Sequence, residues 1–373
     1  MKIIIAGDVF LGGDLIGEDL KSNINIREFH SSDIRILNLE HPITNTEDKA
    51  DKALLYTDTS VIENLVKSNI TAVNLANNHI HDKGNKGILD TLKELNKSGI
   101  GHFGGGANLE EAKKPYWVTK DLCFLGYCQF NSPTLNDIKL ATKDSPGVNP
   151  LTLESILMDL DALPNNTKAI LYFHWGREHV WLTQYKNINL TRTLLKHTKV
   201  KSIIGAHPHR IQGFIEEKNK KAYISLGNFL FPNFYFKKPI DIINYRVKAK
   251  VKITRQYHEV NRITYKKWRN VNRVSQLITY DTHSDKLDHI LVKQMDDYPE
   301  VIKVKGVEKL YFELITNYIS YLYKLPKCLY VFLERITSYI RFKVWFLQIL
   351  MFKIRERGIK WLITKLKLKL YGK

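Results

Sequence analysis

The chain opens with Met1-Lys2-Ile3-Ile4-Ile5-Ala6-Gly7-Asp8, a short apolar run rich in isoleucine that leads directly into a Gly-Asp pair. Runs of this kind are typical of fully buried β-strands. Helical patterns such as Lys86–Lys97 and Tyr185–His197 alternate with six similar runs: Ile34–Leu39, Thr71–Leu75, Leu122–Tyr127, Lys168–Phe173, Ser202–Ile204 and Ala222–Leu226. The alternation predicts an α/β domain built in layers.

Nearly every predicted strand ends in a polar residue that can bind a metal ion. The first strand leads to Asp8, the second to Glu40 and the fifth to His174, while the third and sixth end in Asn77-Asn78-His79 and His207-Pro208-His209. Ligands of α/β sheets bind outside the carboxyl ends of the strands. Carboxylate, amide and imidazole donors that meet there suit Mn²⁺, Fe²⁺, Zn²⁺ or a related divalent ion. The lack of cysteine among them argues against a structural zinc site.

Each motif also has a simpler interpretation. A Gly-Asp pair after a strand is usually a turn, an Asn-rich tract can be turn chemistry, and His174 could be a histidine buried in the core. The His-Pro-His motif is harder to explain by core packing. The joint occurrence at successive strand ends favours a metal site with six ligands: Asp8, Glu40, Asn78, His174, His207 and His209.

Together these motifs resemble the bacterial capsule synthesis protein family, which is named for poly-gamma-glutamate biosynthesis and is similar to calcineurin-like metallophosphatases. The resemblance covers roughly residues 1–240, in the family's order: Gly7-Asp8-Val9-Phe10-Leu11-Gly12, Asn38-Leu39-Glu40, Asn74-Leu75-Ala76-Asn77-Asn78-His79 with Asp82 and Gly84, His174-Trp175-Gly176-Arg177-Glu178, Gly205-Ala206-His207-Pro208-His209 and Ser225-Leu226-Gly227-Asn228-Phe229. It implies a four-layer αββα sandwich of the metallophosphatase type, with metals at the strand ends.

The resemblance implies two metal positions that share a ligand. Asp8 and His209 would bind the first ion, and Glu40 would take the place of the aspartate that bridges the two ions. Metallophosphatases usually carry Asp-x-His at the first motif, whereas Phe10 occupies the histidine position here. The first position is therefore short of a ligand, and we expect one tight metal site with a second, weaker one.

The same resemblance assigns the second metal position and the catalytic acid. Asn78, His174 and His207 would bind the second ion. His79 would lie beside it as the general acid that protonates the leaving group.

Further candidates surround the predicted ions. Asn77 adjoins the ligand Asn78, and Asp82 and Glu178 could orient ligating histidines, although both could be ordinary loop residues. Arg177 could neutralise an anionic substrate, and it could equally be a solvated surface arginine.

The reaction stays open between several classes. The leading hypothesis is a metal-dependent hydrolase or transferase of capsule or anionic exopolymer synthesis, which would act on the polymer or its activated precursor. A phosphoesterase that acts on another anionic substrate is an alternative, and amide chemistry would use the same bound water. The rival hypothesis is a non-catalytic assembly or anchoring factor with the same fold.

Charge and hydropathy set the C-terminal part apart. The formal net charge of the 373-residue chain is +19, and residues 299–373 contribute 16 Lys and Arg against five Glu. We divide the chain into a domain over residues 1–296, with a basic β segment over 240–296, and a basic, aromatic, helical appendage over 297–373. The alternation in Val247-Lys248-Ala249-Lys250-Val251-Lys252-Ile253 predicts an exposed antiparallel segment.

The basic helical region favours an anionic membrane surface as partner. A helical appendage packed on the main domain, with its basic face in solvent, is the alternative. Nucleic acid is less favoured because no recognition motif appears. Three cysteines, Cys123, Cys128 and Cys328, do not suggest a disulfide framework, and the apolar run at the start is too short for the hydrophobic region of a signal peptide. We therefore predict a cytoplasmic protein, peripheral at the inner face of the membrane; the sequence does not indicate the oligomeric state.

Overall fold

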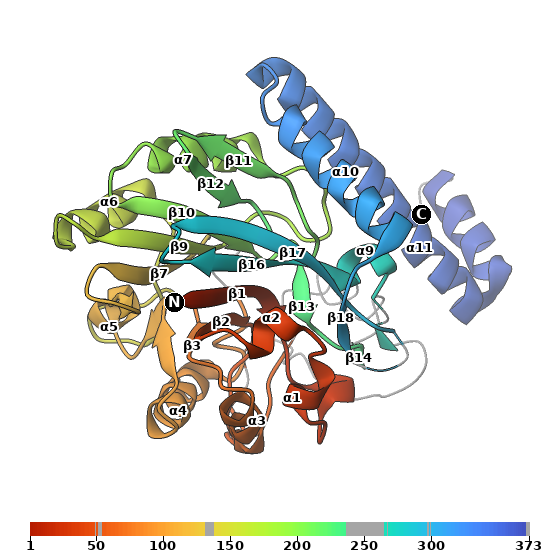
Figure 1. Cartoon of the computed structure of the whole chain (residues 1–373). Helices are drawn as coiled ribbons and strands as arrows, with labels where there is room; N and C mark the ends of the chain where they lie inside the picture. The colour runs from red at the N-terminus through yellow and green to blue at the C-terminus, as the bar shows by residue number, and fades with distance from the viewer. Residues whose placement is uncertain are drawn as a thin grey trace.

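The computed structural model describes residues 1–48, 50, 54–130, 138–235, 265–266, 268–296, 298 and 300–370, and it has a mixed α/β fold (Figure 1). The described strands form two main sheets. The first sheet has the order β18-β17-β16-β1-β2-β3-β4, and β13 also pairs with β1. Its strands are β1 (Lys2–Val9), β2 (Ile34–Leu39), β3 (Ala72–Asn74), β4 (Gly101–Phe103), β13 (Asn228–Leu230), β16 (Val274–Asp281), β17 (Lys286–Gln294) and β18 (Val301–Lys303).

The second sheet has the order β11-β12-β10-β9-β7-β6. Strands β7, β9, β10 and β12 run parallel to one another, and β6 and β11 are antiparallel edge strands. The strands are β6 (Tyr116–Trp117), β7 (Leu122–Cys128), β9 (Lys168–His174), β10 (Val200–Ala206), β11 (Phe214–Glu217) and β12 (Lys220–Tyr223). Two small pairs complete the described strands: β5 (Gly105–Gly106) with β8 (Gly147–Val148), and β14 (Phe234–Tyr235) with β15 (Tyr265–Lys266).

Helices connect and cover these strands. Those of the first half are α1 (Leu20–Asn23), α2 (Arg27–His30), α3 (Ile62–Lys67), α4 (Gly84–Lys97) and α5 (Leu109–Lys113), with 3₁₀ turns at η1 (Gly13–Leu15) and η2 (Thr59–Val61). Those of the second half are α6 (Leu153–Ala162), α7 (Tyr185–Leu195), α9 (Asn270–Arg273), α10 (Gly306–Leu322) and α11 (Lys327–Leu370). Gly358 interrupts α11 with a non-helical backbone, at φ 74° and ψ 162°.

Strand β1 shows why the apolar runs are strands buried on both faces. Its side chains alternate between two cores, as the period of two in a β-strand requires. Ile3 and Ile5 pack into the core between the two sheets, together with Tyr172 of β9. Ile4 and Ala6 pack on the opposite face, in the core that contains Ile88 of α4. The hydroxyl of Tyr172 also donates a hydrogen bond of 2.6 Å to the carbonyl oxygen of Ala6, which ties the sheets together.

The predicted strands and helices are found where the sequence placed them, with boundaries that shift by a few residues. Helix α4 begins at Gly84 and is followed by Gly99, whose φ of 70° gives the glycine stop that the sequence predicts. Its buried residues Ile88, Leu92 and Leu95 recur at helical spacing and face the first sheet. Burying each of these side chains stabilises the fold by about 1.5–3 kcal/mol.

Three antiparallel strands of the C-terminal third extend the first sheet beyond β1. Strand β16 pairs with β1, β17 with β16 and β18 with β17, and most of β16 is buried. The boundary predicted at residue 297 falls before β18, and helix α10 begins only at Gly306. Leu277 faces one apolar core while Ile278 and Tyr280 face another on the opposite side of the sheet, which explains the apolar character of β16. The exposed segment predicted at residues 247–253 lies outside the described residues.

Helices α10 and α11 pack against the second sheet along one side of the molecule (Figure 1). Tyr323 and Tyr330 are buried there, and the hydroxyl of Tyr330 donates a 2.7 Å hydrogen bond to the carbonyl oxygen of Thr183. Ser320 Oγ accepts a 2.8 Å hydrogen bond from the backbone of Phe214. Across the described residues, every helix is too short or too polar to span a lipid bilayer.

Candidate metal centre

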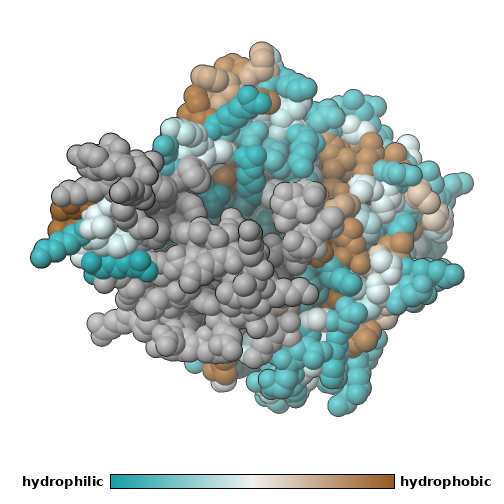
Figure 2. All heavy atoms as spheres, turned by 180° about the vertical axis from the view of Figure 1, so that it is seen from behind, coloured by the Kyte–Doolittle hydropathy of each residue, from teal (hydrophilic) through white to brown (hydrophobic). Residues whose placement is uncertain are grey.

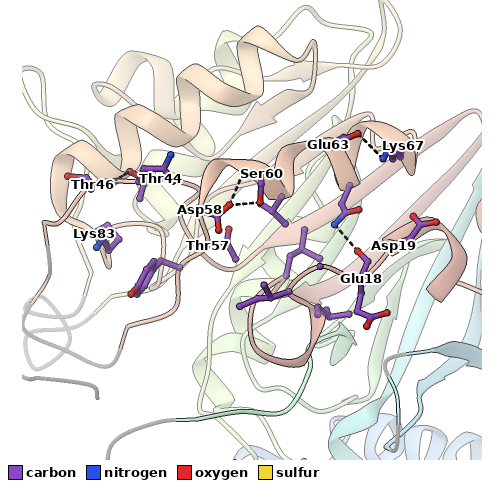
Figure 3. A pocket seen from close by; sticks show the side chains of 18 of the residues that line it. Glu18, Asp19, Thr44, Thr46, Thr57, Asp58, Ser60, Glu63, Lys67 and Lys83 are labelled. Atoms are coloured by element: carbon purple, nitrogen blue, oxygen red, sulfur yellow. Dashed lines mark hydrogen bonds and ion pairs between the residues drawn. The ribbon is translucent and has the colours of Figure 1, made fainter. Parts of the chain in front are cut away.

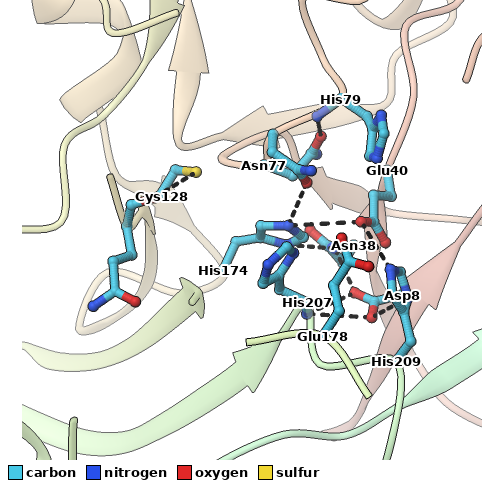
Figure 4. A network of polar contacts seen from close by, with 12 residues as sticks. Asp8, Asn38, Glu40, Asn77, His79, Cys128, His174, Glu178, His207 and His209 are labelled. Carbon is cyan, nitrogen blue, oxygen red and sulfur yellow. Dashed lines mark hydrogen bonds and ion pairs between the residues drawn. The ribbon is translucent and has the colours of Figure 1, made fainter. Parts of the chain in front are cut away.

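The carboxyl ends of parallel strands from both sheets meet at one place and bring the predicted ligands together (Figure 4). Asp8 lies near the end of β1, Glu40 directly follows β2, and His174 is the last residue of β9. His207 and His209 follow β10. Parallel strands place their carboxyl ends at the same edge of a sheet, so residues far apart in the sequence converge.

Two groups of three side chains could each hold a metal ion, and Glu40 belongs to both. One group is Glu40, His174 and His207, and the other is Asp8, Glu40 and His209. Within each group the potential ligand atoms lie within 4.8 Å of one another. Oε1 of Glu40 is 3.6 Å from Nε2 of His174 and 3.7 Å from Nε2 of His209. Glu40 therefore lies between the groups, where the family resemblance implies a bridging carboxylate.

The donor set fits a divalent cation. Asp8 and Glu40 are both fully buried, and burying two carboxylates in one place is strongly unfavourable unless a cation compensates. Burial lowers the pKa of His207 to about 4, so its ring is neutral near pH 7 and has a lone pair to offer. Its Nδ1 is a buried atom with no hydrogen-bond partner among the described residues. Oxygen and imidazole donors together suit Mn²⁺, Fe²⁺ or Zn²⁺.

Strained backbone holds the two histidines after β10. His207 has a φ of 91° and His209 a φ of 51°, both in the region that favours glycine. Such strain costs on the order of 1–3 kcal/mol per residue and persists at functional sites where the surroundings enforce it. The backbone N–H of His207 donates to Oδ2 of Asp8 at 3.2 Å, which links this turn to the end of β1.

Three asparagines that the sequence-based ligand set omits support these ligands. The amide of Asn38 donates to Oδ1 of Asp8 at 2.8 Å, and the amide of Asn74 donates to Oδ1 of Asn38 at 2.7 Å. Oδ1 of Asn228 lies 2.8 Å from Nδ1 of His209. If Nδ1–H of His209 donates to this oxygen, Nε2 keeps its lone pair toward Glu40. Asn38 and Asn74 are fully buried polar residues in apolar strands, which is the signal that could have revealed them.

Asn78 lies beside the ligand group and contacts His174. Its Oδ1 lies 2.8 Å from Nε2 of His174, the same nitrogen that approaches Glu40. All six predicted ligands thus lie together, while their role as ligands stays a prediction.

The predicted general acid has a buried carboxylate partner. Nδ1 of His79 lies 2.7 Å from Oδ2 of Asp82. Asp82 is fully buried, and the same oxygen accepts a 2.6 Å hydrogen bond from the backbone of Leu55. Asn77 fixes the turn, because its Oδ1 accepts from the His79 backbone at 3.0 Å and its amide donates to the carbonyl oxygen of Leu39 at 2.8 Å.

Arg177 and Glu178 occupy the loop that follows His174. Nη1 of Arg177 lies 3.1 Å from both Oε1 of Glu334 and Oγ of Ser338, so Arg177 contacts helix α11 and is outside the ligand group. The charge of Glu178 raises the pKa of His207, against the larger effect of burial. The contribution of either residue to a substrate stays a prediction.

Phe10 lies where the resemblance to metallophosphatases would predict a histidine. It is buried with Leu55, Phe231 and Trp268 in a small apolar cluster. Its ring centroid is 5.2 Å from that of His41, edge to face, and burial lowers the pKa of His41 to about 3. His209 lies against the same cluster, with ring centroids 5.2 Å from Phe231 and 5.3 Å from Trp268. One side of the ligand group is therefore apolar.

A groove of about 930 Å³ lies beside the loops that follow β1 and β2 (Figure 3). Its lining includes Leu11, which lies three residues beyond Asp8, and Lys83, which directly follows Asp82. Nζ of Lys83 lies 4.4 Å above the ring of Tyr56. Thr44, Thr57 and Ser60 are among its lining residues, and the six candidate ligands are not.

The fold and the site define an α/β protein with a candidate metal centre at the carboxyl ends of its strands. The chain belongs to the family described as bacterial capsule synthesis protein PGA_cap, whose model matches residues 2–233. These residues include every candidate ligand and His79.

Three relatives illustrate the match. The chain is 30% identical over 211 residues to the PGA biosynthesis protein CapA of Bacillus subtilis, with 54% of each chain covered. It is 28% identical over 204 residues to the capsule biosynthesis protein CapA of Bacillus anthracis, covering 52% of this chain and 49% of that protein. It is 30% identical over 186 residues to a probable polyglutamine synthesis accessory protein of Mycobacterium tuberculosis, covering 46% and 48%. The chain thus spans about half the length of these relatives.

Proposed function

We propose that this chain is a metal-dependent hydrolase or transferase of bacterial capsule or anionic exopolymer synthesis. The observation that carries the proposal is the position of Glu40 between His174 and His209, at 3.6 Å and 3.7 Å. A carboxylate between two histidine-containing groups could hold one metal ion or bridge two, and ions held in this way activate water for hydrolysis. Membership of the capsule synthesis family and the names of the relatives support the biological setting.

The fold that we propose is the four-layer αββα sandwich of the metallophosphatase type. Three apolar cores support this layering. One core lies between the sheets, one lies between the first sheet and helices that include α4, and one lies between the second sheet and helices that include α7. The basic C-terminal helices would be an appendage to this sandwich.

We propose one tight metal site and a second, weaker one. Glu40, His174 and His207, with Asn78 beside them, would form the tight site. Asp8, Glu40 and His209 would form the weaker site, because Phe10 supplies no donor there. A bound Mn²⁺, Fe²⁺ or Zn²⁺ would lower the pKa of a coordinated water and polarise the substrate oxygen.

The chain's own residues would position the substrate and move its proton. His79 points Nδ1 at the carboxylate of Asp82, which leaves Nε2 to donate a proton to the leaving group. Asn77 holds the turn that carries His79, and Lys83 next to Asp82 places a positive charge at the groove.

The substrate that we propose is an anionic polymer or its activated precursor. The relatives' names refer to capsule, PGA and polyglutamine synthesis, which is consistent with such a polymer. The same site would also suit a phosphoester of another anionic substrate, and bis(p-nitrophenyl) phosphate is the probe for that chemistry.

A second candidate function is a non-catalytic assembly or anchoring factor. The observation that favours it is Phe10, which packs into an apolar cluster at the position of a metallophosphatase ligand. A factor of this kind would keep the fold and bind polymer without hydrolysis.

Metal content and hydrolysis together separate the two candidates. We expect protein incubated with Mn²⁺ or Zn²⁺ and then dialysed to retain about one equivalent of metal and to hydrolyse bis(p-nitrophenyl) phosphate or poly-γ-glutamate chains. His79→Ala should abolish hydrolysis and keep the metal. Retention below about 0.2 equivalents would contradict the enzyme. Bound metal without hydrolysis of either substrate would support the assembly factor.

We also propose a cytoplasmic location. The three cysteines are free thiols, two of them buried, which suits a reducing compartment. Protease treatment of intact and permeabilised cells would test this, because a cytoplasmic protein is cleaved only after permeabilisation.

A further inference from the structure

Helices α10 and α11 expose a long row of large apolar side chains. On α10 they recur every three or four residues: Val307, Leu310, Tyr311, Leu314, Tyr318 and Tyr321. On α11 the row continues with Leu329, Phe332, Ile336, Tyr339, Ile340, Val344, Leu347 and Met351. Large apolar side chains exposed in such numbers on two neighbouring helices usually mark an interaction site (Figure 1). We call these fourteen side chains the apolar row.

The apolar row is not surface left by a loosely attached segment. The opposite faces of both helices are anchored in the protein, through buried Phe312 and Ile319 on α10 and buried Tyr330 on α11. Arg192 also donates a 2.7 Å hydrogen bond to the carbonyl oxygen of Tyr323 between the helices. The helices are therefore amphipathic, with one face in a core and the other facing outward.

Positive charge accompanies the apolar row. Lys324, Lys327, Arg335 and Lys343 are exposed on the same two helices and the turn between them. The carboxylates there are engaged by basic partners: Glu308 with Lys293 at 2.8 Å, Glu313 with Lys309 at 3.5 Å and Glu334 with Arg177 at 3.1 Å. Figure 2 shows apolar and hydrophilic side chains next to each other at the top of the view, where Figure 1 places the turn between α10 and α11.

The segment after Gly358 also combines exposed apolar side chains with basic ones. Ile359, Ile363 and Leu366 are exposed at helical spacing, and Lys360 lies between them in sequence. The guanidinium of Arg357 lies 5.7 Å from the ring centroid of Trp361. Aromatic rings and cationic chains side by side suit the boundary between lipid headgroups and acyl chains.

We propose that the apolar row and its neighbouring basic residues bind the surface of an anionic phospholipid bilayer. The Tyr and Leu side chains would enter the headgroup region, while Lys and Arg contact lipid phosphates. Charge distinguishes a lipid surface from a second copy of this chain as the partner. The region after residue 298 has 16 Lys and Arg against five Glu, so a second copy of the same face would be repelled. An anionic lipid surface is complementary to it in both charge and hydropathy.

Binding on this surface would place the candidate metal centre near the bilayer. Glu334 and Ser338 of α11 contact Arg177, and Arg341 donates to the carbonyl oxygen of Glu178. Both partners lie in the loop that follows the candidate ligand His174. The membrane-binding helix and the rim of the site are therefore joined directly.

Vesicle sedimentation tests the proposal with the full chain. We expect it to bind vesicles of phosphatidylglycerol and phosphatidylcholine, to bind pure phosphatidylcholine at least about tenfold more weakly, and to lose affinity as salt rises. One variant, Leu314→Gln with Tyr318→Gln and Phe332→Gln, removes apolar contacts. Another, Lys324→Gln with Arg335→Gln and Lys343→Gln, removes charge. Each should weaken binding to the mixed vesicles at least about tenfold.

The matched control is Leu89→Gln with Lys93→Gln and Lys97→Gln, which changes exposed residues of the same kinds on α4, away from α10 and α11 (Figure 1). It should bind like the unmodified protein, and all three variants should keep its thermal unfolding midpoint. Two results would overturn the proposal. One is equal vesicle binding by the folded variants and the control. The other is a dimer, seen by light scattering, that the apolar variant converts to a monomer.

Discussion

Nδ1 of His79 lies 2.7 Å from Oδ2 of Asp82, and this carboxylate is completely buried. The contact fixes the ring orientation, because only Nε2 remains available to a group outside the protein. A buried aspartate that holds a histidine in this way is a common support for a catalytic acid.

Replacing the buried carboxylate should impair the chemistry and spare metal binding. In Asp82→Asn, an amide oxygen can still accept from Leu55, but the negative charge beside His79 is lost. We expect turnover of bis(p-nitrophenyl) phosphate to fall by about 10–100-fold while bound metal is unchanged. Asp90→Asn on α4 is the control, since Asp90 contacts Thr44 and Lys86 instead. Equal turnover in the two variants would argue against a role for the His79–Asp82 pair.

Metal retention should depend on Glu40 more than on His209. Because Glu40 belongs to the proposed tight group as well as the weaker one, Glu40→Gln should lose nearly all retained metal, whereas His209→Ala, which changes only the weaker group, should keep most of it. Bound metal is measured by mass spectrometry after dialysis, and circular dichroism checks folding. His283→Ala, at an exposed turn, is the control. A full metal load in Glu40→Gln would show that the ligand set is wrong.

The strands and the convergence of the candidate ligand residues could be predicted from the sequence, because both follow from simple geometry. Apolar β-branched runs form buried strands, and parallel strands bring Asp8 and Glu40 to one edge of the first sheet and His174 and His207 to one edge of the second. The partner of Arg177 could not be predicted in this way. Glu334 lies 157 residues away, and only the packing of α11 on the domain brings the two together.

Supporting residues were also hard to recognise from the sequence. Asn38 and Asn74 lie in strands whose neighbours are apolar, and a polar residue at a strand end is often a turn residue. Their hydrogen bonds to each other and to Asp8 depend on the register of β1, β2 and β3. That register is fixed by the whole sheet.

His102, which is partly buried, should make the protein less stable in mild acid. Burial lowers the pKa of His102 below its ordinary value of 6.5, so the unfolded chain binds its proton more readily than the folded one. Its contribution to stability is therefore present above pH 6.5 and decreases as the pH falls below that value, with a slope of at most about 1.4 kcal/mol per pH unit.

Urea denaturation of metal-free protein at pH 7.5, 6.5 and 5.5 measures this effect. The free energy of unfolding of His102→Gln should fall less between pH 6.5 and 5.5 than that of the unmodified protein. The exposed His283→Gln is the control and should leave the slope unchanged. If the free energy of unfolding falls equally with pH in all three proteins, His102 is not responsible for the effect.

The hydrogen bond between the sheets should have a measurable effect on stability. Tyr172→Phe removes the hydroxyl that donates to Ala6 at 2.6 Å and leaves a buried carbonyl oxygen without that donor. We expect the free energy of unfolding to fall by about 1–3 kcal/mol. Tyr318→Phe, at an exposed position, should change it by less than about 0.5 kcal/mol. Similar values for the two variants would mean that the Tyr172 hydroxyl contributes little.

If the weaker metal site lacks only one donor, a histidine in place of Phe10 should allow a second metal ion to bind. Val9 and Leu11 pack into the same apolar core, so Asp8 and Phe10, which alternate with them along the chain, lie on the other side. Phe10→His would therefore place an imidazole next to Asp8, and retained Mn²⁺ should rise from about one to about two equivalents per chain. The metal-free form should lose about 1–3 kcal/mol of stability, because a polar ring replaces Phe10 among Leu55, Phe231 and Trp268. Phe10→Leu is the matched control, since it disturbs the same cluster and adds no donor. Equal metal content in the two folded variants would show that the rings of Phe231 and Trp268 beside His209, and not a missing ligand, limit the second site.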